Sequence, residues 1–80
     1  MGKAEIRANI SYYRGQRNKL RGKIAKLRNA RIRLYQTSTT VQKEFFLEEI
    51  DRKISQYETS IASYDRSIYM LQEALAMADD

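Results

Sequence analysis

The sequence has no cysteine, histidine, tryptophan or proline, and only three glycines. The lack of cysteine excludes disulfides and thiol chemistry, and the joint lack of cysteine and histidine excludes nearly every zinc site and the commonest general base. Neither a glycine-rich phosphate loop nor a nucleophile–base pair is present. A chain of 80 residues has room for one small domain. We therefore expect a protein that is not an enzyme and needs no cofactor or metal.

Long apolar runs are absent as well. No segment approaches the roughly 18 uninterrupted apolar residues that a membrane span requires. The first six residues also lack the apolar core of a signal peptide. We therefore expect no membrane span and a cytoplasmic location.

Both halves of the chain carry a hydrophobic repeat in which spacings of three and four residues alternate. This spacing keeps one stripe of a helix facing a partner helix, whereas a strand needs a period of two. The first stripe consists of Ile6, Ile10, Tyr13, Arg17, Leu20, Ile24, Leu27, Arg31 and Leu34. The second consists of Leu47, Ile50, Ile54, Tyr57, Ile61, Tyr64, Ile68, Leu71, Leu75 and Ala78. The sequence thus predicts two long amphipathic helices.

The two repeats are out of phase, because the first would continue at Phe45 whereas the second begins at Leu47. Residues 36–41, between them, are rich in β-branched and hydroxyl side chains, which form helix poorly. Thr39 and Gln42 have the spacing of a capping box that would open the second helix. The predicted bounds are about 3–36 for the first helix, 37–40 for the turn and 41–78 for the second helix, within one domain over 1–80. The alternative is one continuous, bent helix.

The charges beside the stripes predict how the helices pair. With Ile10 and Leu47 at heptad position a, position e is basic in the first helix and mostly acidic in the second, and e faces e in an antiparallel pair. The predicted pairs are Arg28–Asp51, Arg21–Glu58, Arg14–Asp65 and Arg7–Gln72. The residue numbers in each predicted pair sum to 79, and those in each core layer, such as Leu27–Ile54, sum to 81. A constant sum is the property of two antiparallel helices. Both sums place the reversal of the chain near residues 39–41, where the phase break lies. The predicted fold is all-α: an antiparallel, coiled-coil-like two-helix hairpin that dimerisation or a partner helix would complete.

Two arginines, Arg17 and Arg31, occupy position a inside the predicted stripe. Either their stems pack while the guanidinium groups reach the edge, or they lower stability in order to enforce one register and exclude higher oligomers. Arg17 would lie level with Tyr64, where a cation–π contact can form. The sequence leaves both interpretations open.

One flank of the hairpin is mostly uncharged, at positions g and c of the second helix. Small side chains there would let another helix approach closely, and phenylalanine and methionine offer adaptable apolar contacts. The candidate partner-binding residues are Ala30, Phe46, Ser60, Ser67, Met70, Ala74 and Met77. Further apolar side chains outside the stripes are Tyr12, Ile32, Tyr35, Phe45 and Tyr69. We expect this flank to bind another helical protein or a second copy of the chain.

The first half of the chain is strongly basic. Residues 1–36 hold 11 Lys or Arg and one acidic residue, whereas residues 37–80 hold four Lys or Arg and nine acidic residues. Four arginines are assigned to the interhelical pairs, which leaves a free basic strip at heptad spacing, made of Lys19, Lys26 and Arg33. Such a strip would track phosphates, as in Rop-type bundles that hold RNA loops on a helix face. Binding of RNA or DNA is therefore the alternative function.

Two glycines, Gly15 and Gly22, lie at the outermost position f of the first helix. They are either neutral on a solvent-facing surface or permit the close approach of something large. The sequence alone favours the first interpretation.

An 80-residue helical hairpin in which Tyr69 is followed by Glu73 four residues later resembles the small ESX/WXG-like proteins of type VII secretion, and particularly the helical partners of LXG toxins. The Trp-x-Gly motif of the central family is absent from the predicted turn. The resemblance implies a hairpin that pairs with another helical protein as a targeting factor or chaperone, and it implies that Tyr69 and Glu73 belong to an export motif. The favoured function is accordingly a non-catalytic helical adaptor or chaperone.

Overall fold

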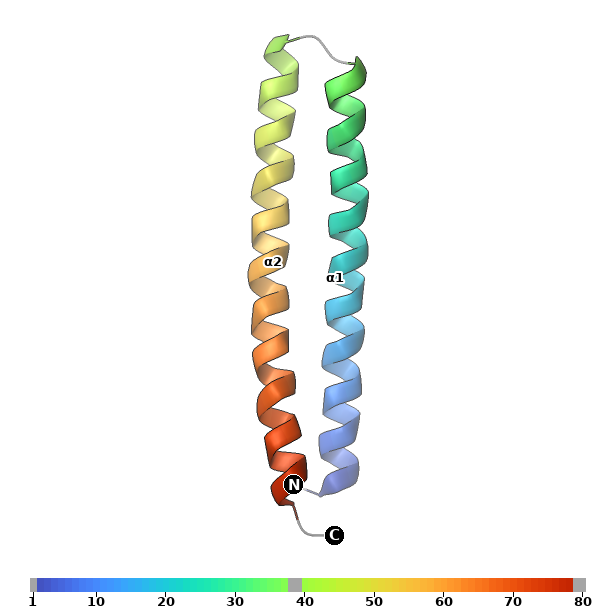
Figure 1. Ribbon diagram of the computed structural model, residues 1–80, viewed down its shortest axis with the longest axis vertical. Helices are drawn as coiled ribbons and strands as arrows, with labels where there is room; N and C mark the ends of the chain where they lie inside the picture. Colours follow the sequence, from blue (N-terminus) through green and yellow to red (C-terminus); the bar gives the residue numbers. More distant parts are fainter. Residues whose placement is uncertain (1, 38–39, 79–80) are drawn as a thin grey trace.

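The chain forms two antiparallel α-helices in the computed structural model, which describes residues 2–37 and 40–78 (Figure 1). Helix α1 spans Lys3–Thr37 and helix α2 spans Thr40–Met77. The two helices contact each other and lie side by side from end to end, so the predicted all-α hairpin is confirmed and the single bent helix is wrong. Each described helix end lies one residue or less from its predicted position. The capping residue Thr39 lies outside the described residues.

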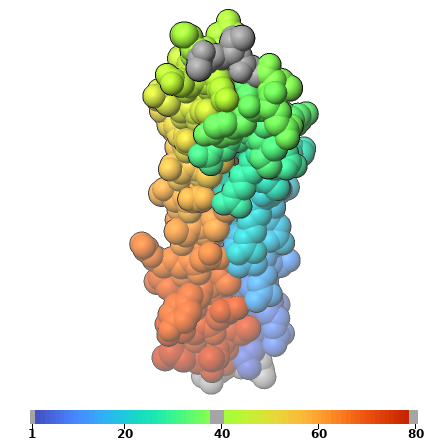
Figure 2. Space-filling view, turned by 45° about the horizontal axis from the view of Figure 1, so that its top comes forward, coloured from blue at the N-terminus to red at the C-terminus, as the bar shows by residue number. Residues whose placement is uncertain are grey.

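The seam between α1 and α2 is made by the two predicted heptad stripes, all of whose members are buried or half-buried. Among residues 2–37 and 41–78, the buried ones are six isoleucines: Ile6, Ile10, Ile24, Ile50, Ile54 and Ile68. Side chains of the two helices meet along the visible face of the molecule (Figure 2). No described side chain is completely enclosed, because each helix is covered on one side only. The hairpin therefore has a thin core and a long exposed surface.

The core is divided into two clusters. The first, near the ends of the chain, contains Ile6, Ile10 and Ile68, with Tyr13, Leu71, Leu75 and Ala78 packed against them. The second, nearer the turn, contains Ile24, Ile50 and Ile54, with Leu27, Ala30, Leu34, Tyr57 and Ile61 packed against them. Predicted layers such as Ile6–Leu75 and Leu27–Ile54 each fall within one cluster.

Arg17 lies in the seam between these clusters. Its side chain is 21% exposed, and its Nη1 donates a hydrogen bond of 3.0 Å to Oδ1 of Asp65. The stem thus packs in the seam while the guanidinium reaches the edge, which is the first of the two interpretations of this arginine. Its Nε is buried without a hydrogen-bond partner. The Tyr64 ring packs at 5.7 Å from the Tyr13 ring, and no cation–π contact with Arg17 is found among the described residues.

Interhelical ion pairs use the predicted carboxylates, but each carboxylate pairs with a different arginine from the one predicted. The pairs are Arg17–Asp65, Arg28–Glu58 and Arg31–Asp51, with N–O distances of 3.0, 3.5 and 3.4 Å. The predicted pairs Arg14–Asp65, Arg21–Glu58 and Arg28–Asp51 are wrong. In every case the arginine lies closer to the turn than expected.

This displacement has a simple geometric cause. Side chains on a helix lean toward the N-terminus of their own helix. In an antiparallel pair, α1 side chains therefore lean toward the chain ends, whereas α2 side chains lean toward the turn. A carboxylate on α2 consequently meets an arginine that starts from a higher-numbered position on α1. Ion pairs predicted from heptad positions alone do not take this opposite lean of the side chains into account.

A lysine of α2 completes the C-terminal end of α1. Nζ of Lys43 donates a hydrogen bond of 3.4 Å to the carbonyl oxygen of Tyr35 and lies 4.7 Å from the centre of its ring. The last four carbonyls of a helix lack helical partners, and positive charge is favourable beside them. In the same turn, the Thr37 hydroxyl donates to the Arg33 carbonyl at 2.7 Å. Lys43 therefore ties the turn end of the hairpin together.

Candidate functional site

The exposed apolar side chains gather near the two ends of the hairpin. Near the chain ends, Met70 and Met77 are 62% and 83% exposed on α2. The predicted partner residue Ala74 is exposed between them, and Ser67 is half-buried. These four residues lie on one side of α2 over about 15 Å, because they alternate spacings of three and four along the helix. We call Ser67, Met70, Ala74 and Met77 the methionine flank.

A shallow pocket of about 300 Å³ adjoins the methionine flank. Its lining combines both helices: Asn9, Tyr13, Ser67, Met70 and Leu71. Tyr13 stands at its inner edge, with the exposed Tyr12 ring packed edge-to-face against it at 5.5 Å. The flank therefore continues onto α1 through these tyrosines. This contribution of α1 was not part of the predicted partner site.

The remaining predicted partner residues lie away from the methionine flank. Phe46 is 48% exposed near the turn, where its ring packs edge-to-face with Phe45 at 5.6 Å. Twenty-four residues of helix separate it from Met70, which corresponds to about 36 Å. Ser60 is exposed between them, and Ala30 is half-buried against the second core cluster. The structure thus brings together four of the seven predicted partner residues.

The hairpin also exposes more surface than its mass requires. The accessible surface is 6177 Å², whereas a compact monomer of 9.4 kDa exposes about 5,000 Å². The difference, about 1,200 Å² by the same scaling, exceeds the roughly 800 Å² that each partner contributes to a standard protein interface. The surface is therefore large enough for one further helical element to bind.

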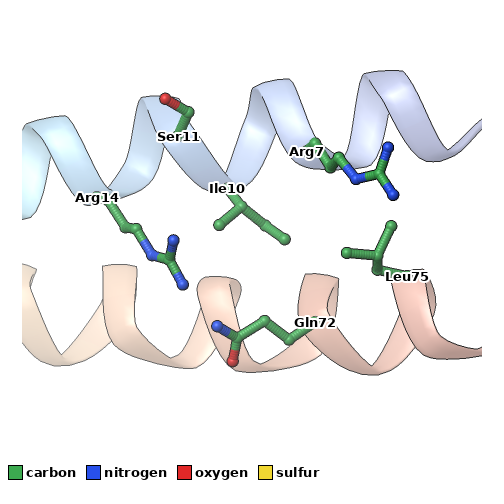
Figure 3. A pocket seen from close by; sticks show the side chains of 6 residues that line it. All are labelled: Arg7, Ile10, Ser11, Arg14, Gln72 and Leu75. Carbon is green, nitrogen blue, oxygen red and sulfur yellow. The ribbon is translucent and has the colours of Figure 1, made fainter.

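A second pocket, of about 290 Å³, lies on the opposite flank near the chain ends. Figure 3 shows its lining, with Arg14 extending from α1 toward α2 and Gln72 projecting from α2. Arg7 and Ser11 complete its polar rim, and Ile10 and Leu75 contribute apolar atoms. Arg7 and Gln72 line this one pocket, but among the described residues no hydrogen bond forms the pair predicted between them. The rim thus holds two arginines and no carboxylate.

The predicted basic strip of Lys19, Lys26 and Arg33 is exposed along α1. None of the three takes part in an ion pair within the described residues. The predicted export-motif residues Tyr69 and Glu73 are both exposed on α2. They are separated by one helical turn, so they lie on the same side of α2.

Within the described ranges, no group of three or more acidic side chains is placed to hold a metal ion. Neither described helix contains a stretch that is long and apolar enough to cross a membrane. Comparison with known proteins finds no matching family model, no matching curated protein and no matching solved structure. The function must therefore be argued from the two flanks of the hairpin.

Proposed function

We propose that the protein is a non-catalytic helical adaptor or chaperone that binds another helical protein through the methionine flank. The observation that carries this proposal is the line of exposed Met70, Ala74 and Met77 beside a pocket that both helices form. Methionine side chains adapt to irregular apolar surfaces, and a small alanine between them leaves room for a helix backbone.

The thin core supports this function. The seam buries one stripe of each helix, and small domains depend on additional burial for stability. A third helix seated on the methionine flank would cover Tyr13, Ser67 and Leu71, which border the first core cluster. Binding would therefore extend an existing core rather than create an isolated contact.

The finer proposal is that the partner is a secreted toxin of the type VII pathway. It rests on the resemblance of the hairpin to partner proteins of that pathway and on the exposure of Tyr69 and Glu73. Tyr69 lies about 100° around α2 from Met70 and stays accessible to a secretion apparatus while the methionine flank is occupied, whereas Glu73 lies one turn from both Met70 and Met77 and borders the flank. Substitution of Tyr69 is expected to abolish export without weakening partner binding.

The test is the mass of the native complex, measured for the unaltered protein and for Met70→Glu/Met77→Glu. We expect the unaltered protein to form a complex with one helical protein, and the double variant to remain a free hairpin with unchanged helicity. Two carboxylates on an apolar contact would have to be desolvated, which is unfavourable without partners.

The matched control is Ser55→Glu/Ala62→Glu, which adds the same two charges at exposed positions on the other side of α2. We expect this control to bind the partner as the unaltered protein does. Equal loss of the complex in both variants, or a protein that stays a 9.4 kDa monomer in its host, would exclude the methionine flank as a binding site.

A further inference from the structure

One row of arginines on α1 is left without carboxylate partners. Arg7, Arg14 and Arg21 share heptad position e, and none of them takes part in an ion pair within residues 2–37 and 40–78. The interhelical pairs use three other arginines, for the geometric reason given above. Members of the row are seven residues apart, which corresponds to about 10.5 Å along the helix. The charges of Arg7, Arg14 and Arg21, which the sequence had assigned to interhelical pairs, are therefore not neutralised by α2 carboxylates within the described residues.

A second unpaired row, at position c, consists of Lys19, Lys26 and Arg33. Positions e and c are about 160° apart around a helix, so the two rows border the outer face of α1. Between residues 8 and 29, the side chains between the rows are small, uncharged and exposed: Ala8, Ser11, Gly15, Asn18, Gly22, Ala25 and Asn29; the exposed Ile32 follows them beside Arg33. A Cβ atom added at Gly15 or Gly22 would meet no atom within 4 Å. The arginine row borders this face near the chain ends and the position-c row borders its other edge nearer the turn, about 18 Å further along the helix. The face is low along its centre between residues 8 and 29.

The positive charge of this face indicates that its ligand is negatively charged. The only acidic residue of α1 is Glu5, in its first turn, and the facing carboxylates of α2, Asp51, Glu58 and Asp65, are paired with Arg31, Arg28 and Arg17. A protein helix would need an apolar stripe to bind, and the centre of this face has none. A polyanion with two parallel lines of charge would match both rows at once.

Double-stranded DNA has that arrangement. The major groove of B-DNA is about 12 Å wide, admits an α-helix and is bordered by two phosphate strands. The major groove of A-form RNA is too deep and narrow for side chains to enter. Position f is about 170° around α1 from the seam, so α2 does not cover the centre of the outer face. Arg7 and Arg14 line a pocket with Gln72 of α2, and their long side chains would turn outward from it to reach a phosphate.

We propose that the outer face of α1 lies in the major groove of double-stranded DNA. Arg7, Arg14 and Arg21 contact the phosphates of one strand, and the position-c row contacts those of the other. Small side chains at the centre allow the helix to approach the groove closely and offer little to distinguish one base from another. Binding is therefore driven by phosphates and largely independent of sequence.

The test is fluorescence anisotropy of a short labelled DNA duplex of mixed sequence over a range of salt concentrations. Six phosphate contacts predict a slope of about −5 for log K against log salt. Arg7→Gln/Arg14→Gln/Arg21→Gln and Lys19→Gln/Lys26→Gln/Arg33→Gln are each expected to reduce that slope by about three and to weaken binding at low salt at least tenfold. All six residues lie outside the core, so circular dichroism should show unchanged helicity.

The matched control, Arg52→Gln/Lys53→Gln/Arg66→Gln, removes the same charge from exposed positions of α2 and should retain the unaltered slope. Equal weakening by the control would show that net charge alone attracts DNA and would overturn the proposal. Absence of duplex binding at low salt, or tighter binding of duplex RNA or single-stranded DNA, would also overturn it. The Met70→Glu/Met77→Glu variant should bind DNA through its intact rows, so failure of this proposal is distinguishable from failure of the adaptor function.

Discussion

Replacing Arg17 by leucine should make the hairpin more stable, although it removes an interhelical ion pair. Arg17 stands between the two core clusters, and its Nε is buried without a hydrogen-bond partner. An unsatisfied buried polar group costs about 1–3 kcal/mol, and the substitution removes that cost. The ion pair to Asp65 is partly exposed on both sides, so its loss costs about 0.2–1 kcal/mol. Leucine also joins the clusters into one apolar seam.

The difference between these terms predicts a net stabilisation of about 1–2 kcal/mol. For a domain of this size, the melting temperature should rise by about 4–8 °C for each kcal/mol. Urea and thermal unfolding followed by circular dichroism would measure both quantities. The companion variant Asp65→Asn tests the ion pair alone and should lower stability by no more than about 1 kcal/mol.

A less stable Arg17→Leu variant would refute this reasoning, because the ion pair would then outweigh the buried Nε. A change in mass would support the other interpretation of Arg17, in which the arginine excludes higher oligomers. Measuring the melting temperature at several protein concentrations separates the two, since only an oligomer has a melting temperature that depends on concentration.

Three further predictions concern stability. Ile54→Ala should destabilise the hairpin by about 2–5 kcal/mol, because it opens a cavity in the second cluster. Urea unfolding would measure this loss of stability, and a loss below about 1 kcal/mol would contradict the burial of Ile54. Lys43→Met should lower the free energy of unfolding by about 0.5–1.5 kcal/mol, because the hydrogen bond to the Tyr35 carbonyl is lost. The control is Lys53→Met, at an exposed position where no such bond is found among the described residues, and it should leave stability unchanged. Gly22→Ala should stabilise α1 by about 1 kcal/mol, since the added methyl group meets open space, and a lower melting temperature would show that something covers this position.

The fold was predictable because one heptad pattern governs nearly every contact. Ile10, Ile24, Ile54 and Ile68 were assigned to the seam by spacing alone, and all four are buried. The phase break after Leu34 also located the reversal between the helices. Long helices with a single contact face leave few other ways to bury such a pattern.

The ion pairs were not predictable to the residue. Heptad letters place Cα atoms level with one another, but the charged groups stand several bonds away and lean in opposite directions on the two helices. Asp65 therefore pairs with Arg17 instead of Arg14, and Asp51 with Arg31 instead of Arg28. Adding the lean of each side chain to the heptad letters would have given the correct direction of this displacement.

The candidate site was predictable in part. The methionine flank followed from heptad positions g and c, and the structure adds Tyr13 and the pocket beside it. The separation of Phe46 from Met70 could also have been calculated from the helix rise. Uncharged residues on the same flank of a long helix therefore need not belong to one site. The unpaired arginine row could not be recognised from the sequence, because it appears only once the true ion pairs are known.

Both proposed surfaces depend on one register between α1 and α2, and a pair of double-mutant cycles tests it most directly. The cycle of Arg17 with Asp65 should give a coupling free energy of about 0.5–1 kcal/mol, because the two groups form a hydrogen-bonded ion pair of 3.0 Å. The cycle of Arg14 with Asp65 should give a coupling indistinguishable from zero. Strong coupling of Asp65 to Arg14 and none to Arg17 would contradict the register, and with it the free arginine row.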